Sequence, residues 1–231
     1  MNRKWIASAL SIASILILGV VAYSFEADFD PSIYNPGVAE IVNFEVCESC
    51  LGDDRSYYRW DFDADGTWET ETDASLTTYS FSAAGYYEVI LDVTSSSGRT
   101  STRRKGVVVG SLPAFAVREL LIQDDGTILV LITINITADC SAIGFQETMP
   151  QGWRIEVVEI GGAMIAHPNP ATKKLEVAWG NEFAAGDTVN FTYRLHPTYA
   201  TSLYGMSGEM SGYTAAGRFV GAIAGELGMA Q

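Results

Sequence analysis

The chain has 231 residues, of which 48% are hydrophobic and 18% charged, so its composition is that of a globular protein long enough for two small domains. A formal net charge of -14 repels phosphate backbones and anionic membrane surfaces, which argues against nucleic acid as a partner. Divalent cations, or neutral and cationic surfaces such as glycans, fit this charge better.

The N-terminus has the pattern of an export segment. Arg3 and Lys4 precede an uncharged apolar run over residues 5–23, and acidic residues follow it directly. The run is long enough to span a bilayer as a helix, while small residues near its end suit a signal peptidase. We therefore predict that residues 1–24 are a hydrophobic export helix, either a cleaved signal peptide or a retained signal anchor. The rest of the chain would then lie outside the cell or on the outer face of its membrane.

Residues 25–37 are acidic and contain two prolines, which predicts a short spacer that holds the next domain away from the membrane. A first domain is predicted over residues 38–110. Its opening strand carries Val42, Phe44 and Val46 at every second position, which is the period of a strand with one buried face.

The most informative stretch of this domain is residues 58–66, Y-R-W-D-F-D-A-D-G. Tyr58, Trp60 and Phe62 share one face of an alternating strand, and an arginine and two aspartates share the other. Residues 85–93, G-Y-Y-E-V-I-L-D-V, repeat the alternation. The pattern predicts a β-sandwich with an aromatic core and one solvated face.

Taken together, the W-D-F-D-x-D-G turn, the aromatic return segment around Tyr79 and the G-Y-Y-E-V-I-L-D-V strand resemble the polycystic kidney disease (PKD) domain family over residues 38–109. The resemblance implies an immunoglobulin-like β-sandwich of a kind found mostly in extracellular modules that bind or space. Within that family the acidic turn is first of all a marker of the fold, and Ala64 stands where a glycine is common.

A second domain is predicted over residues 113–226. Alternating apolar residues over 128–136 and 189–195 indicate two long strands with one buried face each. The segments M-P-Q-G-W, A-W-G and A-G-D-T-V resemble the signposts of β-sandwich repeats in bacterial and archaeal surface proteins. The predicted fold is therefore all-β, with two tandem immunoglobulin-like β-sandwich domains after the export helix.

The acidic turn is also a candidate metal site. Asp61, Asp63 and Asp65, followed by a glycine, match the first half of a calcium loop, and Glu69 can complete a ligand set. An EF-hand is excluded because Thr72 stands where its bidentate glutamate is required. The alternative is structural, since short aspartate side chains close tight turns by accepting backbone N–H groups. Ca²⁺ is the one cofactor that the sequence suggests.

Three cysteines occur in the chain. Cys47 and Cys50 predict a local disulfide in an exported protein, and its geometry requires a turn between them. Cys140 has no partner at a local spacing and is expected to be a buried apolar residue.

Two sequons, N-I-T at Asn135 and N-F-T at Asn190, are candidate glycosylation sites on the outward faces of their predicted strands. Whether they are modified depends on the host.

Four of the fourteen basic residues gather at Arg99, Arg103, Arg104 and Lys105. No glycine-rich loop or helix start accompanies them, so we interpret them as a solvated strand edge rather than as an anion site.

The sequence offers little basis for catalysis. His167 and His196 each precede a proline, with no nucleophile motif nearby, and Asp61 and Asp63 would project side by side rather than across a substrate.

We predict a non-enzymatic extracellular or cell-surface protein that mediates adhesion, spacing or surface assembly. Its expected partners are surface proteins or glycans. The membrane is a further contact if the export helix is retained. The alternatives are a calcium-dependent carbohydrate-binding module and an accessory subunit of a cell-envelope complex. The aromatic residues Trp60, Trp68, Tyr79 and Tyr86 are candidates for a sugar-stacking platform, but the alternation assigns most of them to the core, with Tyr57 and Trp68 as the expected exceptions.

Overall fold

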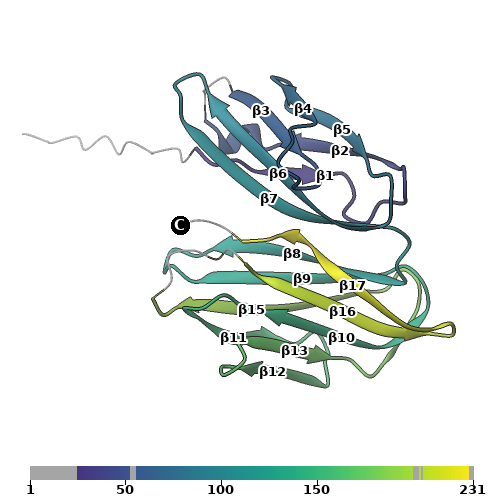
Figure 1. The fold of residues 1–231 in the computed structure, drawn as a ribbon. Helices are drawn as coiled ribbons and strands as arrows, with labels where there is room; N and C mark the ends of the chain where they lie inside the picture. The colour runs from purple at the N-terminus through teal and green to yellow at the C-terminus, as the bar shows by residue number, and fades with distance from the viewer. Residues whose placement is uncertain (1–24, 53–55, 200–202, 204, 229–231) are drawn as a thin grey trace, which may run out of the picture.

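The computed structural model describes residues 25–52, 56–199, 203 and 205–228, and the predicted export helix at residues 1–24 lies outside these ranges (Figure 1). Apart from a 3₁₀ turn, η1 (Glu48–Cys50), the regular elements of the described residues are all strands, which confirms the predicted all-β class. Across these ranges, no helix has the length and apolarity needed to cross a membrane.

The first seven strands form a three-stranded antiparallel sheet, β1-β2-β5, and the antiparallel series β4-β3-β6-β7 (Figure 1). This series is part of a 14-stranded sheet, because β7 also pairs with β17. The strands are β1 (Phe29–Pro31), β2 (Ile41–Val46), β3 (Ser56–Asp61), β4 (Thr70–Thr72), β5 (Leu76–Ser80), β6 (Gly85–Ser95) and β7 (Thr100–Val109). Their inward side chains make one hydrophobic cluster, which closes the sheets on each other.

Aromatic rings dominate this first cluster, as the alternation of residues 58–62 predicts. Trp60 and Phe62 are fully buried, the ring centroids of Phe29 and Trp60 lie 5.1 Å apart, and those of Phe62 and Tyr79 lie 4.1 Å apart. Edge-to-face and offset contacts at these separations stabilise the core beyond the burial of apolar area alone.

The segment predicted as a spacer, residues 25–37, is part of this first cluster, so that prediction is corrected. β1 pairs with β2, with Phe29 opposite Val46, and the Phe29 ring is fully buried. The Asn35 Nδ2 group donates hydrogen bonds to carbonyl oxygens on and just after β7. A three-residue edge strand that ends in a proline is too short to show a period in the sequence, which is why it resembled a linker.

The remaining ten strands enclose a second hydrophobic cluster. They are β8 (Ala114–Ile122), β9 (Ile128–Ile136), β10 (Cys140–Thr148), β11 (Trp153–Glu159), β12 (Ile165–Asn169), β13 (Lys174–Ala178), β14 (Glu182–Phe183), β15 (Thr188–Pro197), β16 (Ser207–Thr214) and β17 (Gly217–Glu226). The strand order is β11-β15-β9-β8-β17-β16-β10-β13-β12, and β14 pairs with β10.

The two long alternating strands of this second cluster are found as predicted. Every second residue of β9 is buried, and β15 pairs with β9 so that Phe191 faces Ile132 and Tyr193 faces Val130. The inward residues of β15 are buried as well. A period of two therefore identifies the core face of both strands correctly.

The two clusters are joined by backbone pairing as well as by the chain. The last residues of β17 pair with β7, with Gly225 opposite Gly106, while the preceding residues pair in parallel with β8 (Figure 1). Gly225 has φ +87°, and a Cβ atom there would lie 2.2 Å from the carbonyl oxygen of Arg118. Only glycine permits this close approach of two backbones.

The junction also holds an ion cluster, which we call the clasp: Arg103, Lys105, Asp28, Asp30 and Glu226. The Lys105 Nζ atom lies 3.1 Å from Asp28 Oδ1, 2.9 Å from Asp30 Oδ1 and 3.0 Å from Glu226 Oε1. Arg103 Nη2 lies 2.7 Å from Glu226 Oε2. Burial opposes the charged form of Lys105, but the surrounding carboxylates, led by Glu226, outweigh it and raise the pKa of this lysine.

The clasp corrects the prediction of a solvated basic edge for two of its four residues. Arg103 and Lys105 lie on the inward face of β7, whereas Arg104 lies on the outward face and pairs with Glu88. Arg99 lies over the Phe25 ring, 4.6 Å from its centroid. The acids that neutralise Lys105 come from β1, from the residue before it and from the end of β17, which no local pattern around residue 105 reveals.

Candidate functional site

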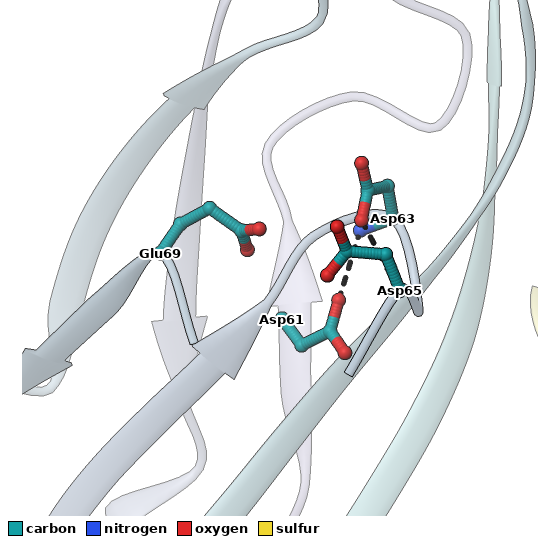
Figure 2. Close-up of side chains that lie close together, drawn as sticks. All are labelled: Asp61, Asp63, Asp65 and Glu69. Carbon is teal, nitrogen blue, oxygen red and sulfur yellow. Dashed lines mark hydrogen bonds between the residues drawn. The ribbon is translucent and has the colours of Figure 1, made fainter. Parts of the chain in front are cut away.

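The candidate site is the acidic turn at the end of β3. Figure 2 shows Asp61, Asp63, Asp65 and Glu69 gathered around this turn, which leads from β3 to β4. One carboxylate oxygen from each residue lies within 4.8 Å of the others, and Asp61 is buried while the other three are exposed. The four predicted ligands are therefore close in space.

Backbone N–H groups of the turn donate to all four carboxylates. Asp61 accepts from Asp63 (3.3 Å) and from Gly66 (2.9 Å). Asp63 accepts from Asp65 at 3.2 Å, and Asp65 accepts from Thr67 at 2.7 Å. These are the hydrogen bonds that the structural alternative predicts for short acidic side chains in a tight turn.

Glu69 closes the turn from its far end. Its Oε2 atom accepts the backbone N–H of Phe62 at 2.8 Å, and the N–H of Glu69 donates to the carbonyl oxygen of Trp60 at 2.9 Å. The acidic side chains therefore hold Phe62 in the position from which its ring enters the first core.

The turn contains two residues in the left-handed region, Ala64 with φ 58° and Gly66 with φ 88°. A side chain in this region costs about 1 kcal/mol, so Ala64 adopts a conformation that favours glycine. The turn holds this conformation through the carboxylate hydrogen bonds on both sides of Ala64.

Chemically, the turn suits a hard cation, because four carboxylates converge on it and carboxylate oxygens are the ligands that Ca²⁺ prefers. Both oxygens of Asp61 already accept backbone N–H groups of the turn. Glu71 takes no part in this arrangement, because it accepts the Tyr57 hydroxyl at 2.8 Å. The acids share one turn and do not face each other across a cleft, as a glycosidase pair must.

We expect Asp61→Ala to lower the free energy of unfolding by about 2 kcal/mol in the presence and in the absence of millimolar calcium, because two backbone N–H groups lose a buried acceptor. Urea denaturation with added calcium or with chelator measures both values. Asp65→Ala is the matched control, since it removes an exposed acid with one such bond. A calcium-dependent rise in the wild-type melting temperature that Asp65→Ala abolishes would show instead that the turn is a calcium site.

The outward face beside this turn carries the two predicted aromatic exceptions. The Arg59 guanidinium lies over the Trp68 ring, 4.7 Å from its centroid, and also pairs with Asp92. Tyr57 is 42% exposed and bonds to Glu71. Both rings lie outside the hydrophobic core of the first sandwich.

Cys47 and Cys50 form a disulfide around η1, with their Cα atoms 5.4 Å apart. The 3₁₀ turn places both side chains on one side, which a straight strand does not do. The entropic effect of closing so short a loop is about 2 kcal/mol. Cys140 is a buried free thiol in the second core.

The two sequons lie on neighbouring strands, Asn135 on β9 and Asn190 on β15. Asn190 is exposed, and its Oδ1 atom accepts the Thr133 hydroxyl at 3.0 Å, while Asn135 is half-buried opposite Thr188. Their glycosylation stays a prediction.

The histidines do not come together. His167 lies on β12, whereas His196 lies on β15 beside Glu156 of β11.

One buried polar group was not predicted from the sequence. It consists of Arg118, Glu147 and Tyr193 and lies in the second core. A charged residue at an inward position of a strand is the signal that points to such a pair.

Comparison with known proteins defines the class of the first sandwich. Residues 32–109 match the PKD domain family, which confirms the resemblance seen in the sequence and moves its start to the segment after β1. No curated protein matches the chain.

Solved structures with some likeness to the chain include a carbohydrate-binding module of the β-sandwich superfamily, with 16% identity over 80% of this chain and 94% of that chain and a TM-score of 0.35. The collagen adhesin CNA from S. aureus has 9% identity over 90% and 95% of the two chains, with a TM-score of 0.34. The major pilin SpaD from Corynebacterium diphtheriae has 11% identity over 74% and 59%, with a TM-score of 0.42. Similarities at this level carry no functional argument.

Proposed function

We propose that the chain is a non-enzymatic exported protein that acts outside the cell or on the outer face of its membrane, in adhesion, spacing or surface assembly through protein or glycan contacts. In this proposal residues 25–110 and 113–226 are two sandwich domains that work as one unit. The observation that carries it is the junction, where β7 pairs with β17 and the clasp neutralises a buried lysine.

A junction of this kind supports a spacing or presenting role because it fixes the orientation of the two sandwiches. Domains that meet only through a linker move relative to each other by default. A shared strand pairing and the ion pairs of Glu226 with Lys105 and Arg103 oppose that motion, because separation would break both.

A binding assay on the native surface tests the proposal. The labelled full-length protein is expected to bind saturably to envelope fragments of its host, and the unlabelled protein is expected to compete. Absence of saturable binding would contradict the adhesion role. A hydrolytic activity that Asp61→Asn or Asp63→Asn abolishes in the folded protein would contradict the non-enzymatic assignment.

The acidic turn favours one alternative, a calcium-dependent carbohydrate-binding module, because it brings four carboxylate oxygens within 4.8 Å of one another. A glycan-array signal that disappears with chelator would distinguish this alternative. The accessory-subunit alternative predicts instead that the protein co-purifies from membranes in a defined larger assembly.

A further inference from the structure

A groove of about 860 Å³ runs along the junction of the two sandwiches. Its first wall is the outward face of β6 and β7, with Tyr86, Glu88 and Arg104, and its second wall comes from β16, β17 and the residues next to them, including Ser207. The volume falls within the roughly 300–1,000 Å³ of sites that hold small ligands or parts of larger ones. It lies apart from the acidic turn, which shares no lining residue with it.

Tyr86 presents its aromatic ring to this groove. In the antiparallel pairing Tyr86 faces Val108, yet its ring reaches diagonally to Gly106, where a Cβ atom would lie 2.6 Å from Tyr86 Oη and 2.7 Å from Cε2. The ring therefore lies along the sheet, in the space that a side chain at residue 106 would fill. The residue stays 43% exposed, so the ring offers a flat apolar surface to a ligand.

The polar end of the same ring has no partner. Among the described residues, no hydrogen bond engages the Tyr86 hydroxyl, and burial of this end raises its pKa to about 12. Arg118 also lines the groove, is 1% exposed, and has a buried Nε atom without a hydrogen-bond partner in the described part of the chain. Unpaired donors beside a cavity favour a ligand rich in hydrogen-bond acceptors.

The charges at the groove select against an ionic ligand. Arg104 Nη1 lies 2.5 Å from Glu88 Oε1, and the Arg118 guanidinium is already paired with Glu147. Thr102 and Ser207 add only hydroxyl groups. A ligand that brings its own charge would find no free counter-charge here, whereas neutral hydroxyl groups can bond to both members of the Arg104–Glu88 pair.

The strands around the groove leave little main chain for a peptide to pair with. β6 pairs with β3 and β7, β8 pairs with β9 and β17, and β16 pairs with β10 and β17. The second edge of β7 pairs with β17 at Lys105 and Gly106, which leaves only the short stretch 100–104 of this strand for a peptide. Addition of an extended peptide to a sheet needs an open strand edge. A flat ring, hydroxyl groups and paired charges match an oligosaccharide better, because sugars combine apolar ring faces with neutral hydroxyl groups.

We propose that this groove binds a neutral oligosaccharide, with one sugar ring stacked on Tyr86 and its hydroxyl groups bonded to Tyr86 Oη and to the Arg104–Glu88 pair. This inference rests on the proposed binding role and names its ligand class. Binding does not require calcium, because the acidic turn contributes nothing to the groove.

A glycan array probed with the purified full-length protein tests the proposal, with neutral, sialylated and sulfated oligosaccharides printed side by side. We expect binding to neutral glycans that persists in chelator. Tyr86→Ala should weaken it about tenfold or more, and Tyr86→Phe less, because it removes only the hydroxyl. Tyr57→Ala is the matched control, since Tyr57 is equally exposed on the same face and lies outside the groove.

The outcomes separate this site from the broader function. Neutral-glycan binding that Tyr86→Ala leaves unchanged overturns the groove as the site while the adhesion role stands. Binding confined to sialylated or sulfated glycans, or no binding to any printed glycan, overturns the ligand class. Saturable binding to host envelope decides the broader proposal independently of either result.

Discussion

Replacing Glu147 with alanine should cost about 3–5 kcal/mol of stability, because the change leaves a buried arginine without its counter-charge. Glu147 and Arg118 are 0% and 1% exposed, and they pair across the second core from β10 and β8. The Tyr193 hydroxyl donates to the second oxygen of the same carboxylate, and Arg118 Nη1 donates to the carbonyl oxygen of Glu226 at 2.5 Å.

The size of this effect follows from what remains after the change. Burial raises the pKa of Glu147 above its ordinary value, and the Arg118 guanidinium and the Tyr193 hydroxyl oppose that rise, so the carboxylate depends on these two groups for its charge. Without the carboxylate, Arg118 cannot lose its proton and keeps only neutral acceptors, among them the carbonyl oxygen of Glu226. The charge of Arg118 is then buried without a partner in the folded state but is solvated in the unfolded state, which lowers the free energy of unfolding.

Urea denaturation of the Glu147→Ala protein measures the loss. Tyr193→Phe is the control, since it removes one hydrogen bond to a charged group and should cost about 1.5–3 kcal/mol. The double change Arg118→Met with Glu147→Leu should restore much of the stability, because apolar residues of similar volume replace buried ion pairs at little cost. A Glu147→Ala protein as stable as wild type, or a double variant worse than the single one, would contradict this account.

Both hydrophobic clusters were predictable from the sequence because the inward faces of their strands are apolar. Trp60 and Phe62 in the first core, and Phe191 and Tyr193 in the second, stand at every second position of their strands and are buried. This period requires no knowledge of partners, since one strand alone shows it.

The polar part of the molecule was predictable only where it is local. The hydrogen bonds of the acidic turn join residues two to seven positions apart, so the structural alternative for Asp61 could be stated from the sequence. Lys105 and Asp30 are 75 positions apart, and Arg118 and Glu147 are 29 apart on different strands. A charged residue on an inward face interrupts the apolar alternation of its own strand, so its position can be seen in the sequence. Its partner on another strand can be identified only from the fold.

Replacing Lys105 with methionine should lower the free energy of unfolding by about 3 kcal/mol and loosen the junction, because Glu226 and Asp28 would lose one of their two cations and keep only Arg103. This expected loss is at the low end of the range for a buried ion pair, because the Asp30 carboxylate is largely exposed and is solvated by water when Lys105 is replaced. The raised pKa of Lys105 means that its contribution is complete below the ordinary lysine value and is lost only as the pH rises above that value.

Arg104→Met provides the matched control, because Arg104 neighbours Lys105 on β7 but pairs with Glu88 on the solvated face, where an ion pair contributes about 0–1 kcal/mol. Spin labels at residues 57 and 190, one on each sandwich, report the distance distribution between the two cores. We expect a narrow distribution for wild type and Arg104→Met, and a broader one for Lys105→Met. If Lys105→Met keeps the narrow distribution, strand pairing between β7 and β17 alone holds the junction, and the clasp contributes to stability without fixing the orientation of the two sandwiches.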